Sequence, residues 1–215
     1  MFDFSSKTKV DRPFKLNELF KLIHADKDLK AKSQNIVSVQ MTNAISESTT
    51  GLKSSNEVNE IYVMKLELSN ESIPYEFLKA LDKTIQFQVL YEIWFENKVK
   101  YLTCYKVIDD GKVSLSKVVE TNWQDYNSSD MPLVSSLLEL YKNILSNIAN
   151  FEFRIGEQIK DWLNRLSEAE KLQKEFQKTE KLMNSETQPK KKFAYNDKLR
   201  EIYDKIISLK STKEN

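Results

Sequence analysis

The chain changes character near Asn150, and this change limits its possible folds more than any other feature of the sequence. Before Asn150, strand-length apolar segments alternate with turn residues and amphipathic stretches. After it the chain is densely charged, has one glycine and one proline, and carries apolar residues at heptad spacing. Such spacing favours helices. We therefore predict an α+β body over residues 1–150 and a charged helical arm over residues 151–215.

The body is predicted to contain a mostly antiparallel sheet of about five strands with helices. The expected strands are residues 36–41, 61–68, 86–96, 99–107 and 113–123, and the expected helices are 14–24, 72–83 and one that begins at Asp130. Asp110-Gly111 lies between two of the strand patterns, and this dipeptide is a strong hairpin signal. The last three strands should therefore form an antiparallel meander.

The arm is predicted to be an antiparallel helical hairpin. Apolar residues alternate steps of four and three in two series, which are Ile155, Ile159, Trp162, Leu166 and Ala169, then Tyr195, Leu199, Ile202, Ile206 and Leu209. The first helix is expected over residues 152–184, and a short connection to the second favours antiparallel packing. We expect the second helix to cover about half of the first.

Charge and cysteine content narrow the class of protein. The formal net charge is +1, so no global field favours nucleic acid or an anionic membrane. The arm holds 15 Lys and Arg against 12 Asp and Glu, which leaves 18 against 20 in the body. The single cysteine, Cys104, excludes an internal disulfide and suits a reducing compartment. No apolar run is long enough to span a bilayer, and residues 1–4 do not resemble a signal peptide. We expect a cytoplasmic protein with no membrane partner.

No catalytic residue, metal site or cofactor is predicted. His24 is the only histidine, so a Ser-His-Asp triad or a histidine-rich metal site is nearly unavailable, and its place near a helix end suits the helix dipole. Cys104 lies between Thr103 and Tyr105, so neither adjacent residue is basic, and it is expected to be a small buried apolar residue. The three glycines are too scattered for a phosphate-binding loop.

Two short segments suggest nucleic-acid chemistry. Glu96-Asn97-Lys98 has the Glu-x-Lys spacing of metal-dependent nucleases, which also need a second acid at the start of a neighbouring strand. Asp82, the only nearby upstream candidate for that acid, falls in a predicted helix. A hairpin turn is the favoured interpretation, and a cryptic nuclease is kept as an alternative. Lys190-Lys191-Lys192 lies close to Phe193 and would suit phosphate contacts, although a lysine run is more often simply solvated.

The apolar stripe of the arm suggests an interface. A second helix of half the length would leave part of the first uncovered, and exposed apolar surface of that extent marks an interaction site. We hypothesise that Ile155, Ile159, Trp162 and Leu166 contact either the body or a partner chain.

Several segments together resemble a known family. They are Phe2-Asp3-Phe4, Val10-Asp11-Arg12, residues 80–85 and 89–92, Val99-Lys100, Tyr105-Lys106, residues 120–123, and Phe193, Asn196 and Leu199 in the arm. With these segments the chain resembles the bacterial domain-of-unknown-function 4391 family, whose members tend to be encoded beside restriction-type DNA methyltransferases and helicases. The resemblance brings no catalytic residues. It implies an accessory component of a restriction-like or phage-defence system.

Three functional classes follow. The first is a non-enzymatic accessory subunit that docks on a DNA methyltransferase or helicase through the arm. The second is a metal-dependent nuclease that uses Glu96 and Lys98. The third is a self-associating structural protein whose arm forms a homo-oligomer.

Overall fold

A computed structural model describes residues 1–212, and the chain forms two compact units, Met1–Ala149 and Asn150–Asn215. We call the first unit the body and the second the arm, and each is described by itself. The helices of the body are the 3-10 helix η1 (Ser6–Thr8), α1 (Leu16–Leu22), α2 (Lys27–Lys32), α3 (Glu47–Thr50), α4 (Tyr75–Thr84) and α5 (Leu137–Ala149). Its strands are β1 (Phe2–Asp3), β2 (Lys9–Phe14), β3 (Ile36–Ser46), β4 (Glu60–Leu68), β5 (Gln88–Phe95), β6 (Lys98–Asp109), β7 (Lys112–Glu120), β8 (Gln124–Asp125) and β9 (Ser129–Asp130).

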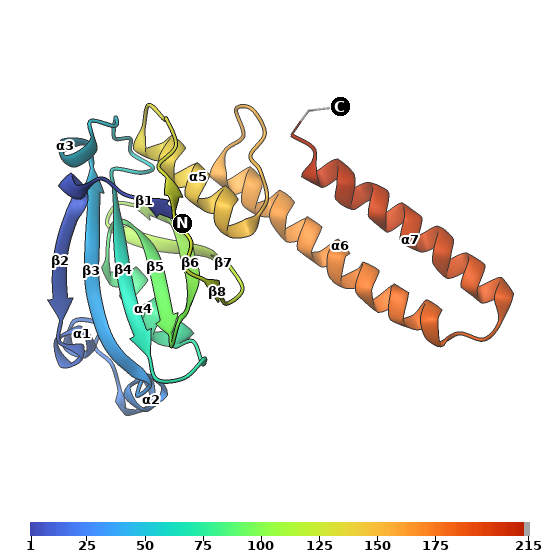
Figure 1. Ribbon diagram of the computed structural model, residues 1–215, viewed down its shortest axis with the longest axis horizontal. Helices are drawn as coiled ribbons and strands as arrows, with labels where there is room; N and C mark the ends of the chain where they lie inside the picture. The colour runs from blue at the N-terminus through green and yellow to red at the C-terminus, as the bar shows by residue number, and fades with distance from the viewer. Residues whose placement is uncertain (213–215) are drawn as a thin grey trace. The chain divides into compact units, whose positions relative to one another are not determined.

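The main sheet has the strand order β2-β3-β4-β5-β6-β7, with β8 paired to the start of β6 (Figure 1). Every neighbouring pair is antiparallel except β4 and β5, which run parallel because α4 carries the chain from the end of one to the start of the other. The expected α+β class is confirmed, with more strands than the five expected. The additional strand β2 is exposed along nearly all of its length, so no apolar alternation marks it in the sequence.

The β6–β7 hairpin follows the predicted chemistry. Asp110 and Gly111 both have positive φ, at 46° and 73°. A two-residue turn with this backbone matches the twist of the flanking strands, and it is why Asp-Gly marks hairpins. The β5–β6 connection is equally tight, with Phe95 paired to Lys98 across it.

Helices cover both faces of the sheet. On one face, α1 and α4 pack on side chains of the central strands, and this core includes Phe20, Phe77, Leu81, Tyr91 and Ile93. The opposite face meets α5, where the Tyr141 hydroxyl lies 2.9 Å from Thr103 Oγ1 of β6 and the Tyr141 ring lies against that of Tyr105. Alternate residues of β6 therefore point toward α4 and toward α5.

The arm is the predicted helical hairpin, formed by α6 (Ile159–Ser185) and α7 (Pro189–Lys210) side by side (Figure 1). Its boundaries correct the sequence-based ones. α6 begins at Ile159 rather than at residue 152, since Gly156 adopts a positive φ of 75°. α7 begins at Pro189, a residue suited to a first helical position, so Lys190, Lys191 and Lys192 are helical.

The two helices of the arm are more nearly equal in length than expected. They contain 27 and 22 residues, or about 40 Å and about 33 Å at 1.5 Å per residue. The expectation that the second helix covers half of the first is therefore wrong. Among residues 1–212, no helix is both long and apolar enough to cross a membrane.

Candidate functional site

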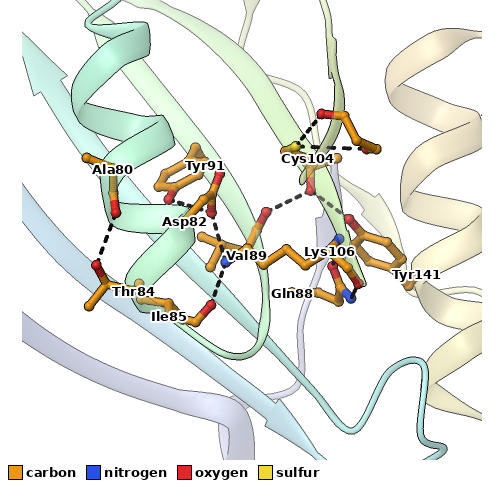
Figure 2. Close-up of polar contacts among 12 residues, drawn as sticks. Ala80, Asp82, Thr84, Ile85, Gln88, Val89, Tyr91, Cys104, Lys106 and Tyr141 are labelled. Carbon is orange, nitrogen blue, oxygen red and sulfur yellow. Dashed lines mark hydrogen bonds and ion pairs between the residues drawn. The ribbon is translucent and has the colours of Figure 1, made fainter. Parts of the chain in front are cut away.

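A cluster of buried polar side chains lies where α4 meets β5 and β6 (Figure 2). Asp82 is 2% exposed and Lys106 is 1% exposed. Lys106 Nζ lies 2.9 Å from Asp82 Oδ1 and also donates to the Ile85 carbonyl at 3.1 Å. The Tyr91 hydroxyl donates to the same Oδ1 at 2.9 Å. A fully buried ion pair is rare in proteins, and this makes the cluster a candidate functional site of the body.

The local structure places both charges in the core. Asp82 comes one turn after Leu78 and directly after Leu81, so it shares the apolar face of α4. Lys106 lies two residues after Cys104 and four after Leu102, so it shares their face of β6. Each charge is therefore directed inward by the periodicity of its own element, and each becomes the counter-charge of the other.

Gln88 fixes the backbone at Lys106. The paired residues of β5 and β6 end at Leu90 and Thr103. Beyond that pair, Gln88 Nε2 donates to the Lys106 carbonyl and the Lys106 amide donates to Gln88 Oε1, both at 3.0 Å. The Gln88 side chain thus replaces a missing pair of sheet hydrogen bonds. Thr103 Oγ1 donates to the Val89 carbonyl at 2.7 Å and continues the network toward α5.

Burial controls the protonation of this cluster. It raises the pKa of the Asp82 carboxyl, while the charge of Lys106 acts in the opposite direction. Burial likewise lowers the pKa of Lys106, and the Asp82 carboxylate acts to raise it. Burial also raises the pKa of the Cys104 thiol to about 11. Cys104 is therefore protonated near neutral pH. Too little thiolate is then present for it to act as a nucleophile.

A cavity of about 300 Å³ adjoins the cluster between α4 and the β6–β7 hairpin. It is lined by Tyr75, Leu78, Lys79, Asp82, Leu102, Cys104, Leu115, Ser116, Lys117 and Val118. Three leucines and a valine give the cavity apolar walls, and the polar or charged residues among the lining are Lys79, Asp82, Cys104, Ser116 and Lys117. This combination of concave apolar surface and a perturbed ionisable group is typical of ligand sites. Asp82 and Cys104 belong to different elements, so their positions in the sequence do not predict that they line one cavity.

In the arm, the four residues proposed for partner binding differ in exposure. Ile155 is 99% exposed, whereas Ile159, Trp162 and Leu166 are buried. The Trp162 ring stacks on Phe153 with centroids 4.7 Å apart, and its Nε1 donates to the Phe151 carbonyl at 3.0 Å. Trp162 is therefore held by the loop that precedes its own helix.

Two arginines tie that loop to the end of α7. Arg165 forms an ion pair with Glu157 at 2.6 Å and lies over the Phe151 ring at 4.4 Å. It also donates to the Leu209 carbonyl, and Arg154 donates to the carbonyls of Ser208 and Ser211. Cations at a helix C-terminus satisfy its last carbonyls and suit its dipole. We call residues 150–158 with Trp162 and Arg165 the clasp.

The lysine run lies in the first turn of α7. Lys190, Lys191 and Lys192 are all exposed, and Lys191 lies 3.9 Å from Glu186. Positive charge is disfavoured at this end of a helix dipole. The hypothesis of a nucleic-acid contact at these lysines stays a prediction.

α7 carries a second stripe on its outer surface. Phe193, Tyr203 and Ile207 are 71%, 55% and 49% exposed, although a helix in a hairpin usually buries such residues. With Asn196 and Arg200 they follow steps of three, four, three and four, which is the spacing of a coiled-coil seam. The inner series Leu199, Ile202 and Ile206 is buried. We call the five exposed residues the outer stripe.

Comparison with known proteins adds one finding to this geometry. A family model described as Domain of unknown function (DUF4391) matches residues 2–206. The chain belongs to this family. No curated protein and no solved structure matches this DUF4391 chain.

The Glu96–Lys98 pair of the DUF4391 chain lies at the tip of the β5–β6 hairpin, as the turn interpretation predicts. Asp82 contacts Tyr91, which is five residues before Glu96 and so about 17 Å away along the strand. Within residues 1–212, no group of three His, Cys, Asp or Glu side chains is placed to hold a metal ion.

We expect the purified protein to leave duplex DNA intact in the presence of Mg²⁺ or Mn²⁺, since no group of three metal-ligating side chains among residues 1–212 is placed to hold the ion. Gel analysis of a plasmid substrate measures this directly. Metal-dependent cleavage that disappears in both Glu96→Ala and Lys98→Ala would instead establish the nuclease alternative.

Proposed function

We propose that this protein is a cytoplasmic, non-enzymatic accessory subunit of a bacterial restriction-like or phage-defence system, and that it docks on a partner protein through its arm. The outer stripe of α7 is the observation that carries the proposal. It supplies three exposed apolar side chains in coiled-coil register on a helix whose other face is already covered by α6. The genomic setting of the family that the sequence resembles supports a DNA methyltransferase or helicase as the partner.

The outer stripe fits one helix of a partner, packed along α7 as the third member of a bundle. Exposed aromatic residues such as Phe193 and Tyr203 are frequent interface anchors. Asn196 and Arg200 interrupt the apolar series, and a polar residue within a seam fixes the register of the pairing helix.

Arg200 favours a different protein over a second copy of this chain. It is the middle residue of the outer stripe, so two copies paired through this stripe about a twofold axis would bring one Arg200 against the other. Like charges in a pairing seam disfavour that complex. Arg200 makes no ion pair with any other residue among 1–212, so its charge is available. The partner helix should therefore carry an acidic residue at the facing position.

The test mixes the purified protein with the products of the adjacent genes and measures complexes by size-exclusion chromatography with light scattering. The variant Tyr203→Lys/Ile207→Lys places two charges in the outer stripe, and Arg200→Glu reverses its central charge. The matched control is Val37→Lys, at an exposed apolar position of β3. Surface changes of this kind alter folding stability by only about 0.5 kcal/mol.

We expect a complex with the wild type and with Val37→Lys, and loss of at least tenfold in affinity with either arm variant. A homo-oligomer of the wild type alone, dissolved by the double variant, would support the self-associating alternative. Monomers that bind none of the adjacent gene products would end the docking proposal.

A further inference from the structure

We propose that the cavity between α4 and the β6–β7 hairpin is a binding site for a small, neutral, mainly apolar molecule that donates one hydrogen bond to Asp82. This site lies in the body and is independent of the proposed docking through the arm. The walls of the cavity, the second carboxylate oxygen of Asp82 and the charge of Lys106 support this site.

The walls of the cavity suit an apolar ligand. Leu78 of α4, Leu102 of β6, and Leu115 and Val118 of β7 provide apolar surface on both sides of the cavity. Cys104 Sγ donates to the Ser116 carbonyl at 2.9 Å, so its hydrogen is already engaged and the sulfur presents a polarisable surface. At about 300 Å³ the cavity lies at the lower end of the usual range for ligand pockets, which suits a molecule of one or two fused rings.

Asp82 provides the polar anchor. Both of its contacts, from Tyr91 and Lys106, go to Oδ1. Within residues 1–212, no donor is hydrogen-bonded to Oδ2, although a carboxylate accepts at both oxygens. Asp82 is 98% buried within the protein and lines the cavity. Oδ2 is not among the solvent-shielded atoms that lack a partner, so it is reached from the cavity, and a bound N–H or O–H group would take this acceptor in place of water.

Lys106 determines that the donor is neutral. It lies behind Asp82, 2.9 Å from Oδ1, and is not part of the cavity wall. Because this ammonium already compensates the carboxylate charge, a cationic ligand would be desolvated without a free counter-charge. A neutral donor forms the hydrogen bond without that cost. The chemical class is therefore a small heteroaromatic or phenolic molecule with one ring N–H or O–H group.

The surroundings provide an entrance. Tyr75 and Lys79 stand at the α4 side of the cavity and are solvent-exposed, and the Tyr75 hydroxyl is turned to Glu120, to which it donates at 2.8 Å. Val118, on the β7 side, is 42% exposed. A larger side chain at Val118 would thus reach into the cavity from its rim without replacing a core residue.

Indole and indene test the proposal as matched probes, because they have the same bicyclic shape and only indole carries an N–H donor. Titrations of the ¹⁵N-labelled full chain, followed by amide chemical shifts, report both the site and the affinity. The variants are Val118→Trp, which fills the cavity from its rim, and Leu115→Trp, which fills it from the wall. Val37→Trp, at an exposed position of β3, is the matched control.

We expect indole to shift the amides of Leu78, Asp82, Cys104 and Leu115 in a saturable manner, and indene to bind about tenfold more weakly. Both filling variants should abolish these shifts, and Val37→Trp should keep them. Equal binding of the two probes would overturn the role of Asp82. Absence of saturable shifts with indole, or shifts that persist in a folded Val118→Trp variant, would overturn the site.

Discussion

Replacing Lys106 by alanine should destabilise the body by about 3–5 kcal/mol, which is the usual consequence of leaving one member of a buried ion pair without its partner. Asp82, which is 2% exposed in the wild type, would keep only the Tyr91 hydroxyl to stabilise its charge. The Ile85 carbonyl would lose its donor as well. Urea unfolding followed by circular dichroism measures the change as a shift of the body transition.

The double variant Asp82→Leu/Lys106→Met separates the ion pair from the general effect of altering the core. Buried pairs can often be replaced by apolar residues with little loss, so we expect the double variant to be more stable than Lys106→Ala. Lys100→Met is the matched control, because Lys100 forms a more exposed ion pair with Glu120 at 3.1 Å. The Lys100 and Glu120 side chains are 12% and 32% exposed, against 0% and 3% for Lys106 and Asp82, so we expect a smaller loss for Lys100→Met. A loss for Lys106→Ala as small as that of Lys100→Met would show that water reaches the pair.

The sequence predicts best those features whose signal lies within a single turn, helix or strand. The Asp110-Gly111 turn and the four-three series of α6 and α7 are local signals, and the structure has the corresponding hairpins. The strand β2 lacked such a signal, because it forms an edge of the sheet and buries almost nothing.

Asp82 and Lys106 lie 24 residues apart in the chain and on different elements, so no local pattern reveals their pairing. Each residue is nevertheless recognisable in the sequence. A charged side chain stands at a position that the apolar pattern of its helix or strand directs inward. Asp82 follows Leu78 by one turn of α4, and Lys106 continues the inward series of Leu102 and Cys104. Two such exceptions of opposite sign in one domain are a signal for a buried pair.

The contacts of the clasp cannot be predicted from the sequence, for a different reason. Its arginines satisfy backbone carbonyls at the far end of α7, and carbonyls have no sequence signature. Residues 152–158 also continue the apolar spacing of α6, which made them resemble its first turns. Gly156 argues against a helix at these residues, because a glycine in a helical pattern indicates a possible break.

Trp162→Ala should have the largest effect in the arm, where we expect it to open the clasp while the body stays folded. Trp162 is completely buried, stacks on Phe153, lies edge-on to Phe151 and donates to its carbonyl. Removing such a side chain from a packed interior costs about 3–5 kcal/mol. Trp162→Phe, which keeps an aromatic ring but loses the donor and part of the buried ring volume, is the matched control and should cost less than Trp162→Ala.

Amide hydrogen exchange locates this effect. A loss of about 3 kcal/mol corresponds to exchange more than a hundredfold faster in α6 and α7, since 1.4 kcal/mol is a factor of ten. Amides of β5 and β6 should keep their wild-type rates, and faster exchange there would contradict a local role. Trp162→Ala should also abolish partner binding, because the outer stripe depends on an ordered α7. Tyr203→Lys/Ile207→Lys should abolish binding with exchange unchanged, so the two variants distinguish a residue that supports the docking surface from residues that form it.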